Sequence, residues 1–344
     1  MRFFIGGYGP HLYMAWLDTE SGALDLVDSV TTPANASFLT CSRRYHTLYA
    51  CVETAASGKG VGRVVAYRMD ERDRLTAVGA AESCGDAPCH LVVSEAHDIV
   101  AVANYMGGSV GIIGVHADGT LGEPIRCIEH EGSGPNKKRQ DRPHPHGVTL
   151  SPDGNRLYVC DLGTDQVICY DPLSEADRMA PTSVTNLSPG SGPRHMCFHE
   201  GHAYLVNELS STVCVFDVDA DTGTLSQLQE VSTLPADYSA GNAAAEIVLH
   251  PSGQFVYVSN RGHDSVAVFA RDGKTGRLGL TGHFDATGPT PRHLAIDPTG
   301  RWCLVAVQDG DFVSSFALDE KSGIGHYSDS VVRITAPSCI AFSK

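Results

Sequence analysis

The chain has 344 residues and a formal net charge of −15, from 25 Lys and Arg against 40 Asp and Glu, with 36 glycines and 18 prolines. The acidic balance argues against a nucleic-acid partner, and no apolar run approaches the ~18 residues of a membrane span. The N-terminal stretch lacks the pattern of a secretory signal. We therefore expect a turn-rich, cytoplasmic protein with no nucleic-acid or membrane partner.

Eleven cysteines are scattered along the chain, and none forms a CxxC pair. Several lie inside apolar segments: Cys51, Cys160, Cys214 and Cys303. We interpret the cysteines as buried free thiols in a reducing compartment. A zinc site made of thiolates is not expected.

In chain order, a unit of about fifty residues recurs seven times. Each unit opens on a short apolar strand, continues through a turn such as "SPDG" (151–154) and returns on a strand such as "RLYVC" (156–160). A third strand of the "QVICY" type and a fourth led by a glycine turn follow. The opening tripeptides end at these residues: Phe38, His90, Gly147, His195, Glu246, His293 and Cys339.

Seven units of four antiparallel strands predict an all-β fold, a seven-bladed β-propeller, as one domain over residues 1–344. The last unit has only "SCIAF" (338–342) before the chain ends. Three N-terminal segments, "RFFIGGY" (2–8), "LYMAWLD" (12–18) and "ALDLVDSV" (23–30), would supply its other strands. We therefore expect the last blade to be closed by strands from both termini, which leaves no open edge.

The first strand of each blade starts at one mouth of the central channel, and the second strand returns to it. The residues that open the first strands are Ser37, Cys89, His146, Arg194, Ala245, Arg292 and Ser338. The residues that follow the second strands are Glu53, Tyr105, Leu162, Glu208, Arg261 and Gln308. The repeat therefore predicts one mouth that carries these charged groups: His146, Arg194, Glu208, Glu246, Arg261 and Arg292, with His144 from the preceding loop.

Simpler interpretations stand beside this one. Asn and Asp at the ends of the second strands fit a structural role in turns. Arg194 and Arg261 could form ion pairs between blades with Glu208 and Glu246. The "HPH" segment (144–146) could contribute to a metal site, but its neighbours are arginines. Three arginines against two carboxylates leave a positive excess, which favours an anionic ligand.

The chain resembles the propeller-type lactonase family, which includes propeller 6-phosphogluconolactonases and carboxy-cis,cis-muconate lactonizing enzymes. The segments that carry the resemblance are "GSGPNKKRQDRPHPHGV" (132–148), "DLGTDQV" (161–167), "GPRHMCFH" (192–199), "VNELSSTVCVF" (206–216) and "AAEIVLHPSGQFVYVSNRGHDSVAVF" (244–269).

The resemblance implies a seven-bladed propeller with a site in its central cleft that needs neither a metal nor another cofactor. The family's motif residues fall here on His146, Arg194, Glu208 and Arg261, as catalytic residues. Weaker matches, expected to bind substrate, are His144, His195, Glu246, Arg292, Gln308 and Gln140. The implied activity is hydrolysis of a small anionic lactone derived from a sugar, such as 6-phosphogluconolactone.

The chemistry of these residues fits that activity. His146 or Glu208 would act as the general base on water. Arg194 and Arg261 would stabilise the oxyanion, and Arg292 would hold a phosphate or carboxylate tail. Two alternatives stay open: a cycloisomerase that lactonizes a carboxylated muconate, and a propeller that binds an anion or a partner without catalysis. The pattern leaves the oligomeric state undetermined.

Overall fold

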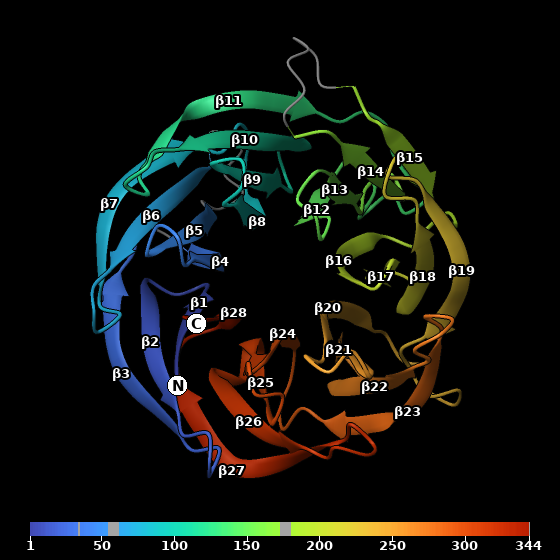
Figure 1. The fold of residues 1–344 in the computed structure, drawn as a ribbon. Helices are drawn as coiled ribbons and strands as arrows, with labels where there is room; N and C mark the ends of the chain where they lie inside the picture. Colours follow the sequence, from blue (N-terminus) through green and yellow to red (C-terminus); the bar gives the residue numbers. More distant parts are fainter. Residues whose placement is uncertain (34, 54–61, 173–179, 344) are drawn as a thin grey trace.

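The computed structural model describes residues 1–33, 35–53, 62–172 and 180–343. It contains seven four-stranded antiparallel sheets arranged around a central axis (Figure 1). Among the described residues the only helix is a short 3-10 turn, η1 (Gln308–Gly310). None of the described residues form a helix long and apolar enough to cross a membrane. The predicted all-β, seven-bladed propeller is therefore confirmed.

Six blades are each made of four consecutive strands, and the first strand of each lies nearest the axis. Their bounds, blade by blade, are β4 (Asn35–Ser42), β5 (Thr47–Glu53), β6 (Arg63–Met69) and β7 (Leu75–Glu82); β8 (Pro88–Ser94), β9 (Ile99–Asn104), β10 (Ser109–Val115) and β11 (Leu121–Glu129); β12 (Pro145–Leu150), β13 (Leu157–Asp161), β14 (Gln166–Tyr170) and β15 (Ser183–Asn186); β16 (Pro193–His199), β17 (His202–Asn207), β18 (Thr212–Val218) and β19 (Leu225–Ser232); β20 (Ala243–Leu249), β21 (Phe255–Arg261), β22 (Ser265–Arg271) and β23 (Leu278–Asp285); β24 (Pro291–Ile296), β25 (Trp302–Val307), β26 (Phe312–Leu318) and β27 (Gly325–Arg333).

The seventh blade joins the two ends of the chain, as the sequence predicts. The C-terminal β28 (Pro337–Phe342) is its inner strand, and β1 (Arg2–Gly7), β2 (His11–Leu17) and β3 (Leu24–Thr31) follow outward. β1 and β28 pair antiparallel, with Phe4 opposite Ala341. Because these strands are hydrogen-bonded to each other, the ring of blades is closed. The expectation of no open edge is wrong in one respect, since each of the seven separate sheets keeps an outer edge strand, such as β3.

The hydrophobic core lies between the blades in seven clusters, one for each interface. Neighbouring residues of a strand point to opposite faces of its sheet. Phe3 and Ile5 accordingly pack toward the β24–β27 blade, whereas Phe4 packs toward the β4–β7 blade. Apolar residues on both faces of each sheet therefore explain why the strands look almost continuously hydrophobic.

The cysteine prediction is wrong at one pair. Cys84, in the loop after β7, forms a disulfide with Cys127 on β11, and their Cα atoms are 5.4 Å apart. The sequence separation of 43 residues gave no local signal, because the bond depends on how the β8–β11 blade folds back beside this loop. The other nine cysteines are free, and Cys51, Cys160, Cys214 and Cys303 are buried as expected.

Reduction of the Cys84–Cys127 bond is expected to lower the free energy of unfolding by about 2–4 kcal/mol, since a cross-link restricts the unfolded chain. Chemical denaturation with and without dithiothreitol measures this difference. The Cys84→Ser variant should show the same loss and no further response to dithiothreitol. Equal stability of oxidised and reduced protein would contradict the prediction.

Candidate functional site

The residue that opens each inner strand sits in a β-bulge. In the β12–β13 ladder, Pro145 pairs with Asp161 and Gly147 with Cys160, so that His146 is skipped. The same shift skips Arg194 and Arg292 in their blades. A bulge kinks the strand and re-aims its side chains. The pairing confirms that first strands open and second strands end at the same mouth.

As a result, two successive residues of an inner strand can face the channel. Together they line a narrow cavity at its centre. The opening residues form its first layer: Ser37, Cys89, His146, Arg194, Arg292 and Ser338. The residues after them, with Tyr8 of the closing blade, complete the lining: Phe38, His195, Glu246 and His293. The bulge that creates this second layer gave no signal in the sequence.

Glu208 is the centre of the charge cluster at the mouth. Its Oε2 accepts from Arg194 Nε at 3.0 Å and lies 2.8 Å from Arg261 Nη2. Its Oε1 accepts from Arg139 Nη2. Burial alone would raise the pKa of Glu208, but Arg261, Arg194 and Arg139 outweigh it and lower that pKa to about 2. Glu208 is therefore a carboxylate that holds three guanidinium groups.

His146 lies in the cavity next to this cluster. Its Nε2 is 3.9 Å from Glu208 Oε2, too far for a hydrogen bond, and its Nδ1 is 4.0 Å from Cys89 Sγ. Burial, followed by the charges of Arg194 and of other nearby groups, lowers the pKa of His146 well below 6.5. The imidazole is therefore neutral near pH 7 and can accept a proton.

Arg292 supplies a charge that the cluster does not neutralise. Its guanidinium carbon lies 5.3 Å from the centre of the Tyr8 ring, a cation–π contact. Among the described residues Arg292 takes part in no ion pair. Burial raises the pKa of Tyr8 to about 12, so Tyr8 stays a neutral phenol. The cavity is thus lined by both an unneutralised positive charge, on Arg292, and a neutral base, His146.

Glu246 contacts two histidines, which with it belong to the second layer of the cavity lining. Glu246 Oε2 lies 3.0 Å from His195 Nδ1 and 3.4 Å from His293 Nε2. His293 Nδ1 accepts from the Ile340 amide at 3.3 Å, and His90 Nδ1 accepts from the Val148 amide at the same distance. His90 and His293 therefore tie neighbouring blades together.

The second-layer position of the β12 strand is held by Gly147, where neighbouring atoms leave no room for a side chain. A Cβ on this residue would overlap the carbonyl oxygen of Arg194 and come within 3.1 Å of His195 Cδ2. The glycine therefore allows the β12 and β16 strands to approach closely beside His146.

Arg139 is a site residue that the sequence interpretation did not select. It lies on the loop 130–144 between β11 and β12, and besides Glu208 it donates from Nη2 to Tyr105 Oη at 3.3 Å. Its neighbour Gln140 was selected from the resemblance. In the sequence, the only sign of a role for Arg139 is the basic segment "KKR" (137–139), of which it is the last residue. Its contact with Glu208 depends on the folded loop.

The remaining predicted residues lie near the mouth without lining the cavity. Gln140 Nε2 donates to Leu162 O at 2.9 Å and to Asp165 Oδ1 at 2.7 Å, which anchors the loop 130–144. His144 Nδ1 lies 2.8 Å from Tyr105 O. Gln308 begins η1, and its side chain donates to Asp309. In this structure the side chains of Gln140, His144 and Gln308 therefore contact other protein groups and not the cavity.

The expected structural role of Asn and Asp at the ends of the second strands fits these contacts. Asn104 Nδ2 donates to Ser83 O at 2.7 Å, and Asn260 Nδ2 donates to Thr233 O at 2.9 Å. Asp161 Oδ1 accepts from the amides of His144 and Gly163. Arg194 and Arg261 also form an ion-pair cluster, although both pair with Glu208 and neither pairs with Glu246.

Across the described part of the chain, no group of three or more His, Cys, Asp or Glu side chains is arranged to hold a metal ion. His146 and His195 have ring centres 5.3 Å apart, and His195 is engaged by Glu246. The "HPH" segment thus places His146 in the cavity, whereas His144 contacts Tyr105 and Asp141.

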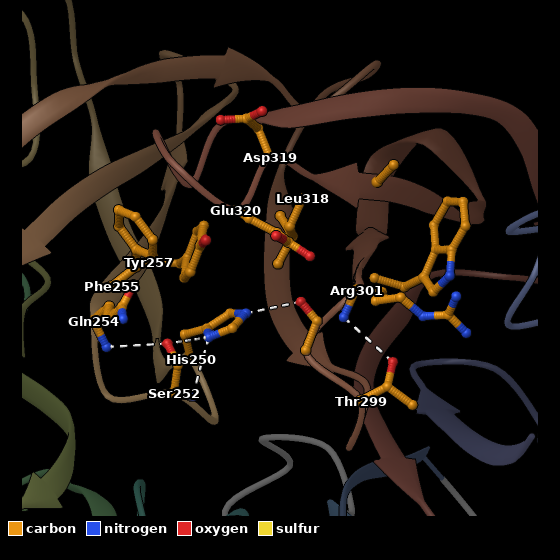
Figure 2. A pocket seen from close by; sticks show the side chains of 13 residues that line it. His250, Ser252, Gln254, Phe255, Tyr257, Thr299, Arg301, Leu318, Asp319 and Glu320 are labelled. Carbon is orange, nitrogen blue, oxygen red and sulfur yellow. Dashed lines mark hydrogen bonds between the residues drawn. The ribbon is translucent and has the colours of Figure 1, made fainter.

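A larger pocket of about 550 Å³ lies between the β20–β23 and β24–β27 blades, at the ends of the strands away from the charged mouth (Figure 2). Several of its polar groups are engaged in contacts within or between the surrounding turns. His250 Nε2 lies 2.8 Å from Gly300 O, and Asp319 accepts from the amides of Lys321 and Ser322. The candidate site is therefore the smaller cavity, where ionisable groups converge.

Comparison with known proteins gives a consistent result. The family model described as "Lactonase, 7-bladed beta-propeller" matches residues 2–342. A 6-phosphogluconolactonase of Bacillus subtilis is 31% identical over 352 residues, which cover 99% of each chain. A 6-phosphogluconolactonase of Pectobacterium atrosepticum is 31% identical and covers 90% of this chain and 88% of its own.

A solved structure extends the comparison to three dimensions. The periplasmic gluconolactonase of Pseudomonas aeruginosa superposes with a TM-score of 0.91 at 32% identity, and the match covers 98% of both chains. The likeness therefore includes every blade and the central channel.

Proposed function

The chain belongs to the seven-bladed β-propeller lactonase family, and from this premise we propose how its central site hydrolyses a lactone. The activity is that of a lactonase on a small, phosphogluconolactone-like substrate. The observation that carries the proposed mechanism is the cavity that neutral His146 lines together with Arg194 and Arg292.

In the first step, His146 accepts a proton from water while the water oxygen adds to the lactone carbonyl carbon. Glu208 is the weaker candidate for the base, because its pKa of about 2 makes it a poor proton acceptor and its oxygens are engaged by three arginines. We therefore assign the base to His146 and the positioning of the guanidinium groups to Glu208.

The carbonyl oxygen becomes an oxyanion, which needs fixed positive charge. Arg194 and Arg292 line the cavity with His146, whereas Arg261 does not line it. We therefore assign oxyanion stabilisation to Arg194 and Arg292, which revises the sequence-based expectation for Arg261 and Arg292. When the intermediate collapses, the bond to the ring oxygen breaks and protonated His146 returns its proton to that oxygen. The product is the open-chain hydroxy acid.

We propose separately that the protein works in the cytoplasm. Nine free cysteines favour the cytoplasm that the sequence led us to expect, whereas the Cys84–Cys127 bond favours an oxidising environment. Cells are lysed directly into denaturant with an alkylating agent, before any reducing agent is added. Eleven alkylated cysteines support a reducing compartment, and nine support an oxidising one.

The pH dependence tests this mechanism. Because the pKa of His146 is lowered in the folded protein, kcat/KM for 6-phosphogluconolactone should be constant near pH 7 and fall only when the pH drops below 6.5. The rates are measured with EDTA present and corrected for spontaneous opening of the lactone. An acid limb centred above pH 6.5 would contradict the assignment of His146. Turnover of a carboxylated muconate with no lactone hydrolysis would overturn the proposed reaction.

A further inference from the structure

We propose that Arg139 selects phosphorylated lactones by binding the substrate's terminal phosphate at the mouth of the channel. The inference rests on the proposed function and adds to it the residue that distinguishes a phosphorylated sugar lactone from an unphosphorylated one.

The first observation is the position of the side chain. The Arg139 side chain is 38% exposed, against 4% for Arg194 and 15% for Arg261. It therefore lies at the solvent side of the Glu208 cluster, and the two deeper arginines lie behind it. The loop that carries it is anchored by Gln140, whose Oε1 accepts from the Asn136 amide at 3.1 Å. The guanidinium is thus both accessible and held in place.

The second observation is the number of free donors. Both hydrogen bonds of the Arg139 guanidinium, to Glu208 and to Tyr105, are made by Nη2. Among the described residues, Nε and Nη1 have no hydrogen-bond partner. Three N–H groups therefore remain for an incoming acceptor. Phosphate oxygens are strong acceptors that match guanidinium geometry.

The third observation is the local charge. Arg139, Arg194 and Arg261 share the single carboxylate of Glu208, which leaves an excess of two positive charges. A phosphate near its second ionisation carries a comparable negative charge. The ion pair between Arg139 and Glu208 can persist when phosphate binds, because the two use different faces of the guanidinium group.

The shape of the substrate indicates where its phosphate would lie. In a six-membered sugar lactone the carbonyl carbon and the carbon that bears C6 lie on opposite sides of the ring oxygen. A carbonyl placed beside His146 and Arg194 therefore directs a C6 phosphate away from the reacting carbon. A dianion is costly to bury, so Arg139, at the solvent side of the Glu208 cluster, is a better partner for it than Arg292, which lines the inner cavity.

The test compares two substrates that differ only in the phosphate, 6-phosphogluconolactone and glucono-δ-lactone. Arg139→Ala should lower kcat/KM for the phosphorylated lactone by about 10- to 100-fold, mainly through KM, the range for a lost hydrogen bond to a charged group. Its kcat/KM for glucono-δ-lactone should change by less than about threefold. Arg139→Lys, which keeps the charge and loses the fork, should fall between.

The matched control is Lys138→Ala, which removes one positive charge from an exposed neighbouring position of the same loop and should leave both substrates unaffected. Calorimetry with the products provides a second readout: Arg139→Ala should weaken binding of 6-phosphogluconate and leave gluconate unchanged. An equal fall for both lactones would overturn the inference and leave Arg139 as a support for Glu208. No change for either would also overturn it. If wild-type protein hydrolyses neither lactone, the proposed function itself fails.

Discussion

Replacement of His146 by alanine is expected to lower kcat for lactone hydrolysis by at least about 100-fold, the usual scale for a lost general base. The structure gives the reason, because His146 is a buried neutral imidazole in the cavity shared by Arg194 and Arg292. Without it, water must attack unassisted, while the arginines still bind the lactone. KM should therefore change much less than kcat, as single-turnover and steady-state rates would show.

His97→Ala is a suitable control for the loss of a histidine. His97 lies in the turn between β8 and β9, away from the charged mouth, where Nε2 is 3.1 Å from Gly154 O. This variant should keep full activity. Near-wild-type turnover by His146→Ala, in protein with an unchanged circular dichroism spectrum, would rule out His146 as the base.

Replacement of Glu208 by glutamine should lower both stability and activity, because it leaves three guanidinium groups without their shared carboxylate. The pKa of Glu208 is lowered from its ordinary 4.5 to about 2 in the folded protein. This shift corresponds to about 3 kcal/mol of folding free energy. This contribution is complete above pH 4.5 and is lost as the pH falls toward 2. Urea unfolding at pH 7 measures the difference between the variant and the wild type.

The comparison with an exposed acid makes the Glu208 prediction specific. Glu200 is 63% exposed and pairs with Arg271 at 2.9 Å, so solvent screens the pair and Glu200→Gln should leave the stability almost unchanged. Added inorganic phosphate should partly restore the stability of Glu208→Gln, since an anion can replace the missing charge. Equal stability of the two variants would mean that solvent screens the Glu208 cluster.

Much of the fold could be predicted because a propeller repeats the same short sequence patterns in each blade. The "SPDG" turn and the "LYVC" strand appear in the third blade, and related turns and strands appear in the others. The period and the split last blade therefore led directly to a ring closed by β1 and β28. Strand alternation also determined which residues fill the interfaces between blades.

The candidate site was only partly predictable. His146, Arg194, Glu208 and Arg261 occupy equivalent ends of inner strands or their partners, so the repeat alone brought them to one mouth. Arg139 belongs to the loop 130–144, which is longer than any other connection between blades in the described part of the chain. Its approach to Glu208 depends on the anchoring of Gln140. Periodic reasoning gives no position for such a loop.

The sequence by itself thus determined the number of blades, their closure and the presence of a positively charged mouth, because each follows from short-range patterns repeated seven times. The tertiary structure alone decided which charges meet. The β-bulges turn His146 and Arg292 into one cavity, the loop carries Arg139 to Glu208, and the Cys84–Cys127 bond joins segments 43 residues apart. These contacts depend on distances between segments remote in the chain, which no local pattern encodes.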